Sequence, residues 1–156
     1  MVNIDAKSGF NKLRITHAST DREWQAVRQF RQKYFFDKVP ISDPYTWTFD
    51  HNEHVHFILY QGTIIIGYAH IQLWNDLRAA LRIIVIDEVY RNKGMGSYFL
   101  SLIEKWLKSQ RITKLQIQSS PEAYHFYVQH HYINMLFNDP DGYESDPRDI
   151  EIGKIL

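Results

Sequence analysis

One short basic segment with two glycines has the residue types and spacing of a phosphate site. The string RNKGMG occupies residues 91–96, after an apolar run and before a segment with helical periodicity. The first amides of a helix have no partner inside the helix, and the helix dipole adds partial positive charge there. Glycines let a ligand approach those amides closely, and Arg91 and Lys93 add positive charge. The segment therefore predicts a site for a phosphate or pyrophosphate.

A buried strand and an amphipathic helix are the elements that must position this segment. Residues 81–86 read LRIIVI, an apolar and β-branched run that is typical of a strand covered on both faces. After Gly96 the apolar residues follow the spacing of one helix face; they are Phe99, Leu102, Ile103, Trp106 and Leu107. The pattern predicts a strand, a glycine-bearing loop and a helix in that order.

Two other phosphate motifs fit this loop poorly. The chain has no G-x-x-x-x-G-K-[ST] string, and Phe99 stands where the dinucleotide motif G-x-G-x-x-G needs its third glycine. A nucleotide-phosphate binder is therefore the weaker hypothesis. The simplest alternative is a plain connection whose basic residues are solvated.

Composition and charge exclude several classes of protein. A chain of 156 residues with 44% hydrophobic residues suits one folded domain, 1–156. Lys plus Arg equals Asp plus Glu, 18 each, which gives no support for a nucleic-acid or membrane-surface partner. The absence of cysteine excludes a disulfide scaffold and a thiolate site. Neither a membrane span nor a signal peptide is predicted, so we expect a cytoplasmic protein.

Local patterns predict the remaining elements. Thr20 and Glu23 have the spacing of a capping box, which predicts a helix that runs to about Phe36, with Arg28 and Arg31 on its solvent side. The other expected elements before the basic segment are a strand at 13–16, a loop or short helical turn at 39–47, and a hairpin of 56–60 and 63–73 with its turn at Gln61-Gly62. After it we expect a strand at 113–118 parallel to 81–86, a helix at 121–130, and strands at 132–137 and 149–156.

Residues 91–96 resemble the R-x-x-G-x-G loop that binds the acyl-CoA pyrophosphate in the GNAT superfamily of N-acetyltransferases. A second string, SPEAYHFY at residues 120–127, is similar to the family pattern N-x-x-A-x-x-F-Y. Ala123, Phe126 and Tyr127 match, whereas Ser120 replaces the asparagine. The resemblance implies an α/β (α+β) fold. Its mixed, mostly antiparallel twisted sheet would carry a central parallel pair, 81–86 and 113–118, flanked by helices.

The resemblance also implies an activity and its substrates. An acetyl group would pass from acetyl-CoA, without a metal, to a primary amine of a small molecule or protein by direct transfer in a ternary complex. In the family the central parallel strands splay, and the pantetheine arm lies between them. Carried over, the residues that bind the acyl donor would be Ile84, Val85, Ile86, Arg91, Asn92, Lys93, Gly94, Met95, Gly96, Ser97, Ser120, Phe126 and Tyr127.

Two residues are candidates for the proton transfers of such a reaction. Tyr127 matches the position of the family's common donor to the leaving thiolate; the alternatives are a structural tyrosine here and Tyr124 as the donor. Some relatives place a glutamate base at the start of the fourth strand, where residues 79–82 carry no carboxylate. His70 is therefore the candidate base, with a water chain as the alternative. A non-catalytic acyl-CoA sensor is the second functional hypothesis.

Three other features are open to more than one interpretation. His51, His54 and His56 could bind zinc, but they fit the polar start of a strand better because no further ligands are evident. The aromatic residues of 45–49 could wall a pocket or pack over the core edge. The terminal strand could pair with a second subunit as a homodimer, since open edges invite partners.

Overall fold

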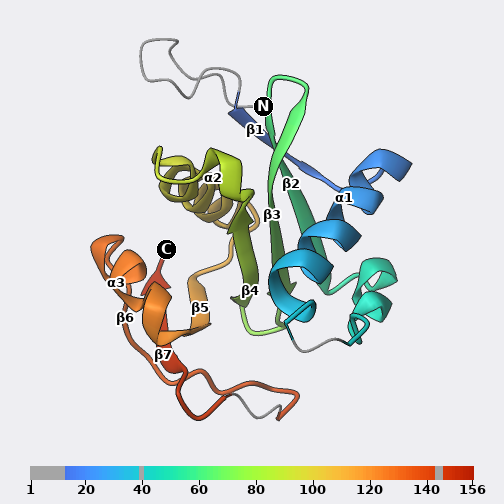
Figure 1. Ribbon diagram of the computed structural model, residues 1–156. Coiled ribbons are helices and arrows are strands. Elements are labelled where there is room, and N and C mark those ends of the chain that lie inside the picture. Colours follow the sequence, from blue (N-terminus) through green and yellow to red (C-terminus); the bar gives the residue numbers. More distant parts are fainter. Residues whose placement is uncertain (1–12, 39–40, 143–145) are drawn as a thin grey trace.

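The computed structural model describes residues 13–38, 41–142 and 146–156, so residues 39–40 of the expected loop lie outside it. Within this part of the chain, one sheet has the strand order β1-β2-β3-β4-β5-β7-β6 (Figure 1). The strands are β1 (Leu13–His17), β2 (His54–Gln61), β3 (Ile64–Leu73), β4 (Arg78–Ile86), β5 (Lys114–Ser119), β6 (Ile133–Asn134) and β7 (Ile150–Ile155).

Helices cover both faces of the sheet. The helical elements are α1 (Asp21–Arg31), the π-helical turn η2 (Gln32–Phe36), the 3-10 turns η3 (Thr46–Asp50) and η4 (Glu88–Tyr90), α2 (Met95–Ser109) and α3 (Pro121–Gln129). Side chains of α2 and α3 pack into the larger apolar cluster, whereas Val27 and Phe30 of α1 pack into a second cluster with Ile58 and Val85. Figure 1 shows α1 and α2 on opposite sides of the strands. Among the described helices, none is both long and apolar enough to cross a bilayer.

The start of α1 confirms the predicted capping box. The backbone N–H of Glu23 donates to the Thr20 hydroxyl at 3.1 Å, and the Thr20 N–H donates to a Glu23 carboxylate oxygen at 3.1 Å. At α3 the Ser120 hydroxyl caps the helix by accepting from the Ala123 amide, and Pro121 follows at the first helical position. Local side-chain chemistry therefore fixes where two of the helices begin.

The pairing of β4 with its neighbours opens a gap in the middle of the sheet. β4 is antiparallel to β3 and parallel to β5, as predicted. Its pairing with β5 covers only Arg78, Ala79 and Ala80, which face residues 114–116. Beyond Ala80, the β5 side of β4 has no strand partner among the described residues, while β5 pairs with β7 on its other side. The two central strands therefore separate toward the end of β4.

The structure corrects several boundaries. β4 begins at Arg78, three residues before the predicted strand 81–86, and the predicted strand 132–137 shrinks to Ile133–Asn134. Phe137 leaves the sheet because its ring packs edge-on against Trp74, 5.2 Å between centroids, and its carbonyl accepts a hydrogen bond from Arg78. The terminal strand β7 lies between β5 and β6, so the edge expected to be open is partly occupied.

Candidate active site

The predicted phosphate loop does form the start of α2. Gly94 adopts φ of +78°, a left-handed conformation that glycine accepts without strain, and it precedes the first helical residue, Met95. Tyr98 is the first residue of α2 whose amide donates back along the chain, to the Gly94 carbonyl at 3.2 Å. The amides of residues 95–97 therefore stand at the positive end of the helix, as an anion site requires.

A cavity of about 650 Å³ opens beside these amides, and we name it the loop cavity. Its lining contains most of the acyl-donor residues implied by the sequence. An added Cβ on Gly96 would lie 3.8 Å from the Phe126 ring and 4.0 Å from Ile86, so the cavity is open at that point. The lining residues are Ile84, Val85, Ile86, Arg91, Asn92, Gly94, Met95, Gly96, Ser97, Glu122, Ala123, Phe126 and Tyr127.

Two of the implied residues lie outside that lining. Lys93 is exposed on the loop. The Ser120 hydroxyl accepts a hydrogen bond from the Ala123 amide at 3.3 Å, so it serves as the cap of α3. Glu122 lines the cavity although the sequence motif assigned it no role.

The backbone of β4 borders the loop cavity on the side where β5 has moved away. The Val85 carbonyl faces β3, because it would lie 3.0 Å from a Cβ on Gly67. Backbone groups alternate along a strand, so those of Ile84 and Ile86 face the gap. The Ile86 carbonyl accepts a hydrogen bond from Arg91 Nε at 2.7 Å. Ile84 thus presents backbone groups that need partners there.

Tyr127 projects from α3 into the same cavity. Its side chain is 6% exposed and packs edge-on against Phe126 and Tyr132. Among the described residues, no hydrogen-bond partner of its hydroxyl is found. Burial raises the pKa of the Tyr127 phenol, so the group stays protonated. An unpaired, protonated phenol in a cavity can donate a proton.

A second cavity of about 650 Å³ lies on the other face of β4, and we name it the histidine cavity. Ile83 lines it, whereas the next residue, Ile84, lines the loop cavity; neighbouring side chains of a strand point to opposite faces. Gln118 of β5 also lines the histidine cavity, so this cavity reaches the gap between β4 and β5. The remaining lining residues are Arg31, Phe35, Phe36, Tyr45, Trp47, Thr48, His54, His70, Gln72, Arg82, Asp141, Asp146 and Asp149.

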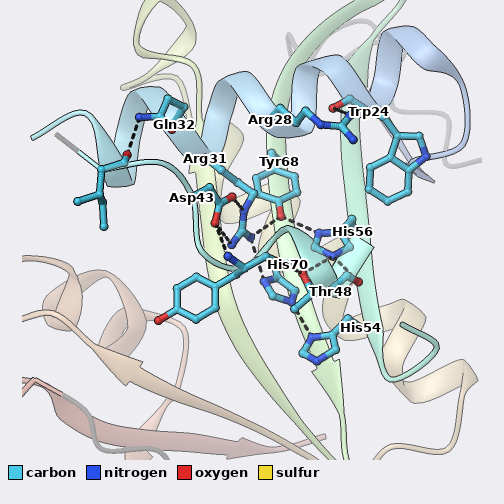
Figure 2. A network of polar contacts seen from close by, with 12 residues as sticks. Trp24, Arg28, Arg31, Gln32, Asp43, Thr48, His54, His56, Tyr68 and His70 are labelled. Atoms are coloured by element: carbon cyan, nitrogen blue, oxygen red, sulfur yellow. Dashed lines mark hydrogen bonds and ion pairs between the residues drawn. The ribbon is translucent and has the colours of Figure 1, made fainter. Parts of the chain in front are cut away.

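A buried arginine organises the wall of the histidine cavity (Figure 2). Arg31, expected on the solvent side of α1, is 1% exposed. Its Nη1 donates to Tyr68 Oη at 2.9 Å and to His70 Nδ1 at 3.1 Å, while its other nitrogens contact the Asp43 carboxylate. Tyr68 Oη in turn contacts His56 Nδ1 at 2.7 Å. The cation is thus neutralised by one carboxylate and hydrogen-bonded to groups of β3.

Strand register brings three histidines to this wall. His56 and His70 are paired residues of β2 and β3, with ring centroids 4.4 Å apart. His54 is two residues from His56 and contacts His70, with 2.8 Å between His54 Nδ1 and His70 Nε2. The i, i+2 spacing of His54 and His56 is visible in the sequence, but the pairing with β3 is not. Among the described residues, no group of three or more His, Cys, Asp or Glu could hold a metal ion.

The geometry of His70 makes it a poor acceptor for a substrate proton. The side chain is 4% exposed. Arginine nitrogens only donate, so His70 Nδ1 must accept from Arg31, and its lone pair is occupied. Burial, together with the charge of Arg31, holds the pKa of His70 well below its ordinary value. Tyr127 and His70 also belong to different cavities on opposite faces of β4.

Comparison with known proteins identifies the family. The sequence model of the Acetyltransferase (GNAT) family matches residues 24–132, which include most of α1, the loop of residues 91–96 and α3. This chain therefore belongs to the GNAT acetyltransferase family. No curated protein sequence matches it.

Solved structures share the fold across nearly the whole chain. A GNAT-family acetyltransferase from Staphylococcus aureus is 16% identical, with a TM-score of 0.71, covering 92% of this chain and 99% of that one. The PaiA N-acetyltransferase from Thermoplasma acidophilum, solved with coenzyme A, is 12% identical, with a TM-score of 0.66 and coverage of 92% and 99%. An Arabidopsis thaliana protein in complex with the bisubstrate analogue CoA-Ac-MVNAL is 15% identical, with a TM-score of 0.67 and coverage of 93% and 99%.

Proposed function

We propose that this protein transfers the acetyl group of acetyl-CoA to a primary amine by direct attack in a ternary complex. The observation that carries this proposal is the gap between β4 and β5, because the loop cavity lies against one face of β4 and the histidine cavity against the other. Two substrates that enter from opposite sides can meet there without a covalent enzyme intermediate. Holding both in one site supplies much of the rate.

The loop cavity fits the acyl donor. The pyrophosphate would accept hydrogen bonds from the amides of residues 95–97, next to the positive end of α2 and to Arg91. The pantetheine arm is extended and carries amide groups. It would lie along β4 and pair with the free backbone groups of Ile84. The complex of the Thermoplasma acidophilum relative with coenzyme A supports this choice of ligand.

The chemistry then needs two proton transfers. The amine nitrogen forms a bond to the acetyl carbon, and the bond between that carbon and sulfur breaks. Tyr127 would donate its phenolic proton to the leaving thiolate and recover a proton from solvent afterwards. The amine proton would leave to water in the histidine cavity rather than directly to His70, because Arg31 occupies the lone pair of His70.

Calorimetric titration with acetyl-CoA tests the proposal, with dephospho-CoA and ATP as controls. We expect binding of both CoA compounds, and weaker binding of ATP, which lacks the pantetheine arm. Turnover is then sought in a panel of amines by following release of free CoA thiol. No binding of acetyl-CoA at millimolar concentration would refute the assignment.

One observation favours a non-catalytic acyl-CoA sensor as the second candidate. No carboxylate lies on β4, and the lone pair of His70 is engaged, so neither β4 nor His70 supplies a dedicated base. A sensor would bind acetyl-CoA in the calorimeter but would acetylate no amine. Turnover that falls in a Tyr127→Phe variant would exclude the sensor.

A further inference from the structure

Among the described residues, His54 is the one histidine of this wall that both lines the histidine cavity and is partly exposed. Its Nδ1 lies 2.8 Å from His70 Nε2. Its Nε2, on the far side of the ring, has no hydrogen-bond partner in the described part of the chain. The ring also packs edge-on against Trp47, with 5.2 Å between centroids. Figure 2 shows Arg31, His70 and His54 as a continuous chain of contacts.

The direction of the hydrogen bonds in this chain follows from Arg31. A guanidinium has only donors, so Arg31 Nη1 can contact His70 Nδ1 only if that nitrogen carries a lone pair. A neutral imidazole has one N–H, so the proton of His70 lies on Nε2 and is donated to His54 Nδ1. The same reasoning places the proton of neutral His54 on Nε2. Burial, with the nearby charges of His51, Arg82 and Arg31, lowers the pKa of His54 to about 4, which keeps the ring neutral.

We propose that Arg31, through His70, locks His54 as a hydrogen-bond donor toward the acceptor substrate. The acceptor amine would then carry an oxygen that can accept this bond, in a carbonyl or a hydroxyl group near the nitrogen. This inference rests on the proposed function, because it takes the histidine cavity as the acceptor site. His54 is a specificity-determining residue in this scheme, and Arg31 and His70 are positioning residues.

The arrangement of protons can be measured on the intact protein without any turnover. Long-range ¹H–¹⁵N spectra of the histidine rings separate a protonated nitrogen from one with a lone pair. We expect the proton of His54 on Nε2 and the lone pair of His70 on Nδ1. A proton on His54 Nδ1 would overturn the proposal, whether or not the protein acetylates an amine.

A double variant tests whether Arg31 sets this direction. Arg31→Met with Asp43→Asn removes both members of the ion pair, so neither charge is left buried alone. Without the donor from Arg31, the direction of the hydrogen bond between His70 and His54 can reverse. We therefore expect His54 to carry its proton on Nδ1 in part of the population. An unchanged tautomer in the folded double variant would refute the role of Arg31. If this variant does not fold, the proposal is tested by the histidine tautomers of the wild-type protein and by the acceptor preferences of the His54 variants.

The substrate part of the proposal needs acceptors that differ only in the oxygen. Phenylalaninamide, phenylalaninol and 2-phenylethylamine share an aromatic ring, which suits the wall formed by Tyr45 and Trp47, and a primary amine. Each acceptor is compared with itself in wild type and in His54→Phe, so differences in amine basicity cancel. We expect kcat/KM for the two oxygen-bearing acceptors to fall about threefold to tenfold through KM, as for one lost hydrogen bond, with 2-phenylethylamine unchanged.

Two further variants complete the test. His51→Phe makes the same change on a neighbouring histidine that is absent from the cavity lining, and all three acceptors should be unaffected. His54→Gln keeps an N–H donor and an acceptor for His70, so it should restore part of the loss. An equal fall for all three acceptors would mean that His54 only shapes the cavity, which would overturn the proposal.

A binding experiment replaces the kinetics if none of the three acceptors is acetylated. The protein–CoA complex is then titrated with phenylalaninamide while the NMR resonance of the His54 Nε2–H is followed. A resonance that does not shift would refute the proposal. Failure of the proposed function itself would appear as a lack of acetyl-CoA binding.

Discussion

Arg31 and Asp43 form a salt bridge in which the two side chains are only 2% and 8% exposed. Two contacts join them, from Nε to Oδ2 and from Nη2 to Oδ1 at 3.3 Å. The pair ties the end of α1 to the segment that leads into η3. It also neutralises the cation that directs the histidine chain. Because both ions have left water, each depends on the other for compensation.

Removal of Asp43 should therefore destabilise the protein strongly. We expect Asp43→Ala to lower the free energy of unfolding by about 3–5 kcal/mol, since the Arg31 charge would remain buried without a partner. Urea denaturation measures this change. Asp37→Ala is the matched control, because Asp37 is exposed, and its effect should stay within about 0.5 kcal/mol. Equal effects of the two substitutions would show that the salt bridge contributes little.

The buried histidines should make stability depend on pH in a range where most carboxylates do not titrate. Burial, with the charge of Arg31, lowers the pKa of His56 from 6.5 to about 4 in the folded protein. Below the ordinary pKa the unfolded chain binds a proton that folded His56 does not, so stability is lost as the pH falls from 6.5 toward 4. For His56 alone we expect a loss of about 2 kcal/mol between about pH 7 and pH 5.

Urea denaturation at a series of pH values measures this effect. In His56→Gln the amide cannot titrate, so the free energy of unfolding should fall less over the same range. Parallel curves for wild type and variant would contradict the low pKa of His56.

Gly96 offers a test of the loop cavity that does not disturb the fold. An added Cβ would make only ordinary contacts, 3.8 Å to Phe126 and 4.0 Å to Ile86, and alanine favours helix over glycine by about 1 kcal/mol. We therefore expect Gly96→Ala to be at least as stable as wild type but to bind acetyl-CoA more weakly, because the methyl group occupies the approach to the amides. Gly96→Glu should abolish binding through its bulk and negative charge.

Thermal unfolding and calorimetric titration with acetyl-CoA measure the two effects separately. Ser120→Ala is a useful comparison, because it should cost about 1 kcal/mol as a lost helix cap while leaving acetyl-CoA affinity unchanged. Undiminished affinity in a folded Gly96→Glu protein would rule out the loop as the pyrophosphate site.

Sequence patterns predicted the helices and strands more accurately than they predicted the buried polar contacts. The capping box of Thr20 and Glu23, the apolar run of β4 and the helical period of α2 are local signals, so each element was found near its observed position. Arg31 was misplaced because a long polar side chain next to Phe30 gives no local sign of burial. Its partners, Asp43 and His70, come from a distant loop and strand.

The residues around the loop cavity show the same difference between local and distant signals. The order of strand, loop and helix placed residues 84–86 and 94–97 together around one cavity, since these residues are close in sequence. Ser120 was assigned from a motif position, but its hydroxyl is used by the Ala123 amide. The position of Ser120 directly before Pro121 is a local signal for a helix cap, whereas a motif match does not show that its hydroxyl faces a cavity.

Tyr127 should be important for turnover and unimportant for stability. Its hydroxyl has no partner among the described residues, so Tyr127→Phe leaves no polar group unpaired and should change the free energy of unfolding by less than about 0.5 kcal/mol. If the phenol protonates the leaving thiolate, kcat should fall by about 10²- to 10⁴-fold, with little change in acetyl-CoA affinity. Stopped-assay rates and calorimetry on the same samples separate the two quantities.

Other tyrosines of the same region decide whether this loss is specific to Tyr127. Tyr132 donates its hydroxyl to Glu104 at 2.7 Å, so Tyr132→Phe should lower stability without a comparable fall in kcat. Tyr124, whose hydroxyl contacts Asn134 at 3.4 Å, is the alternative proton donor. A large fall in kcat for Tyr124→Phe and a normal rate for Tyr127→Phe would transfer the role to Tyr124. Normal rates in both variants would mean that the thiolate leaves without a protein donor, and that the loop cavity contributes binding and orientation alone.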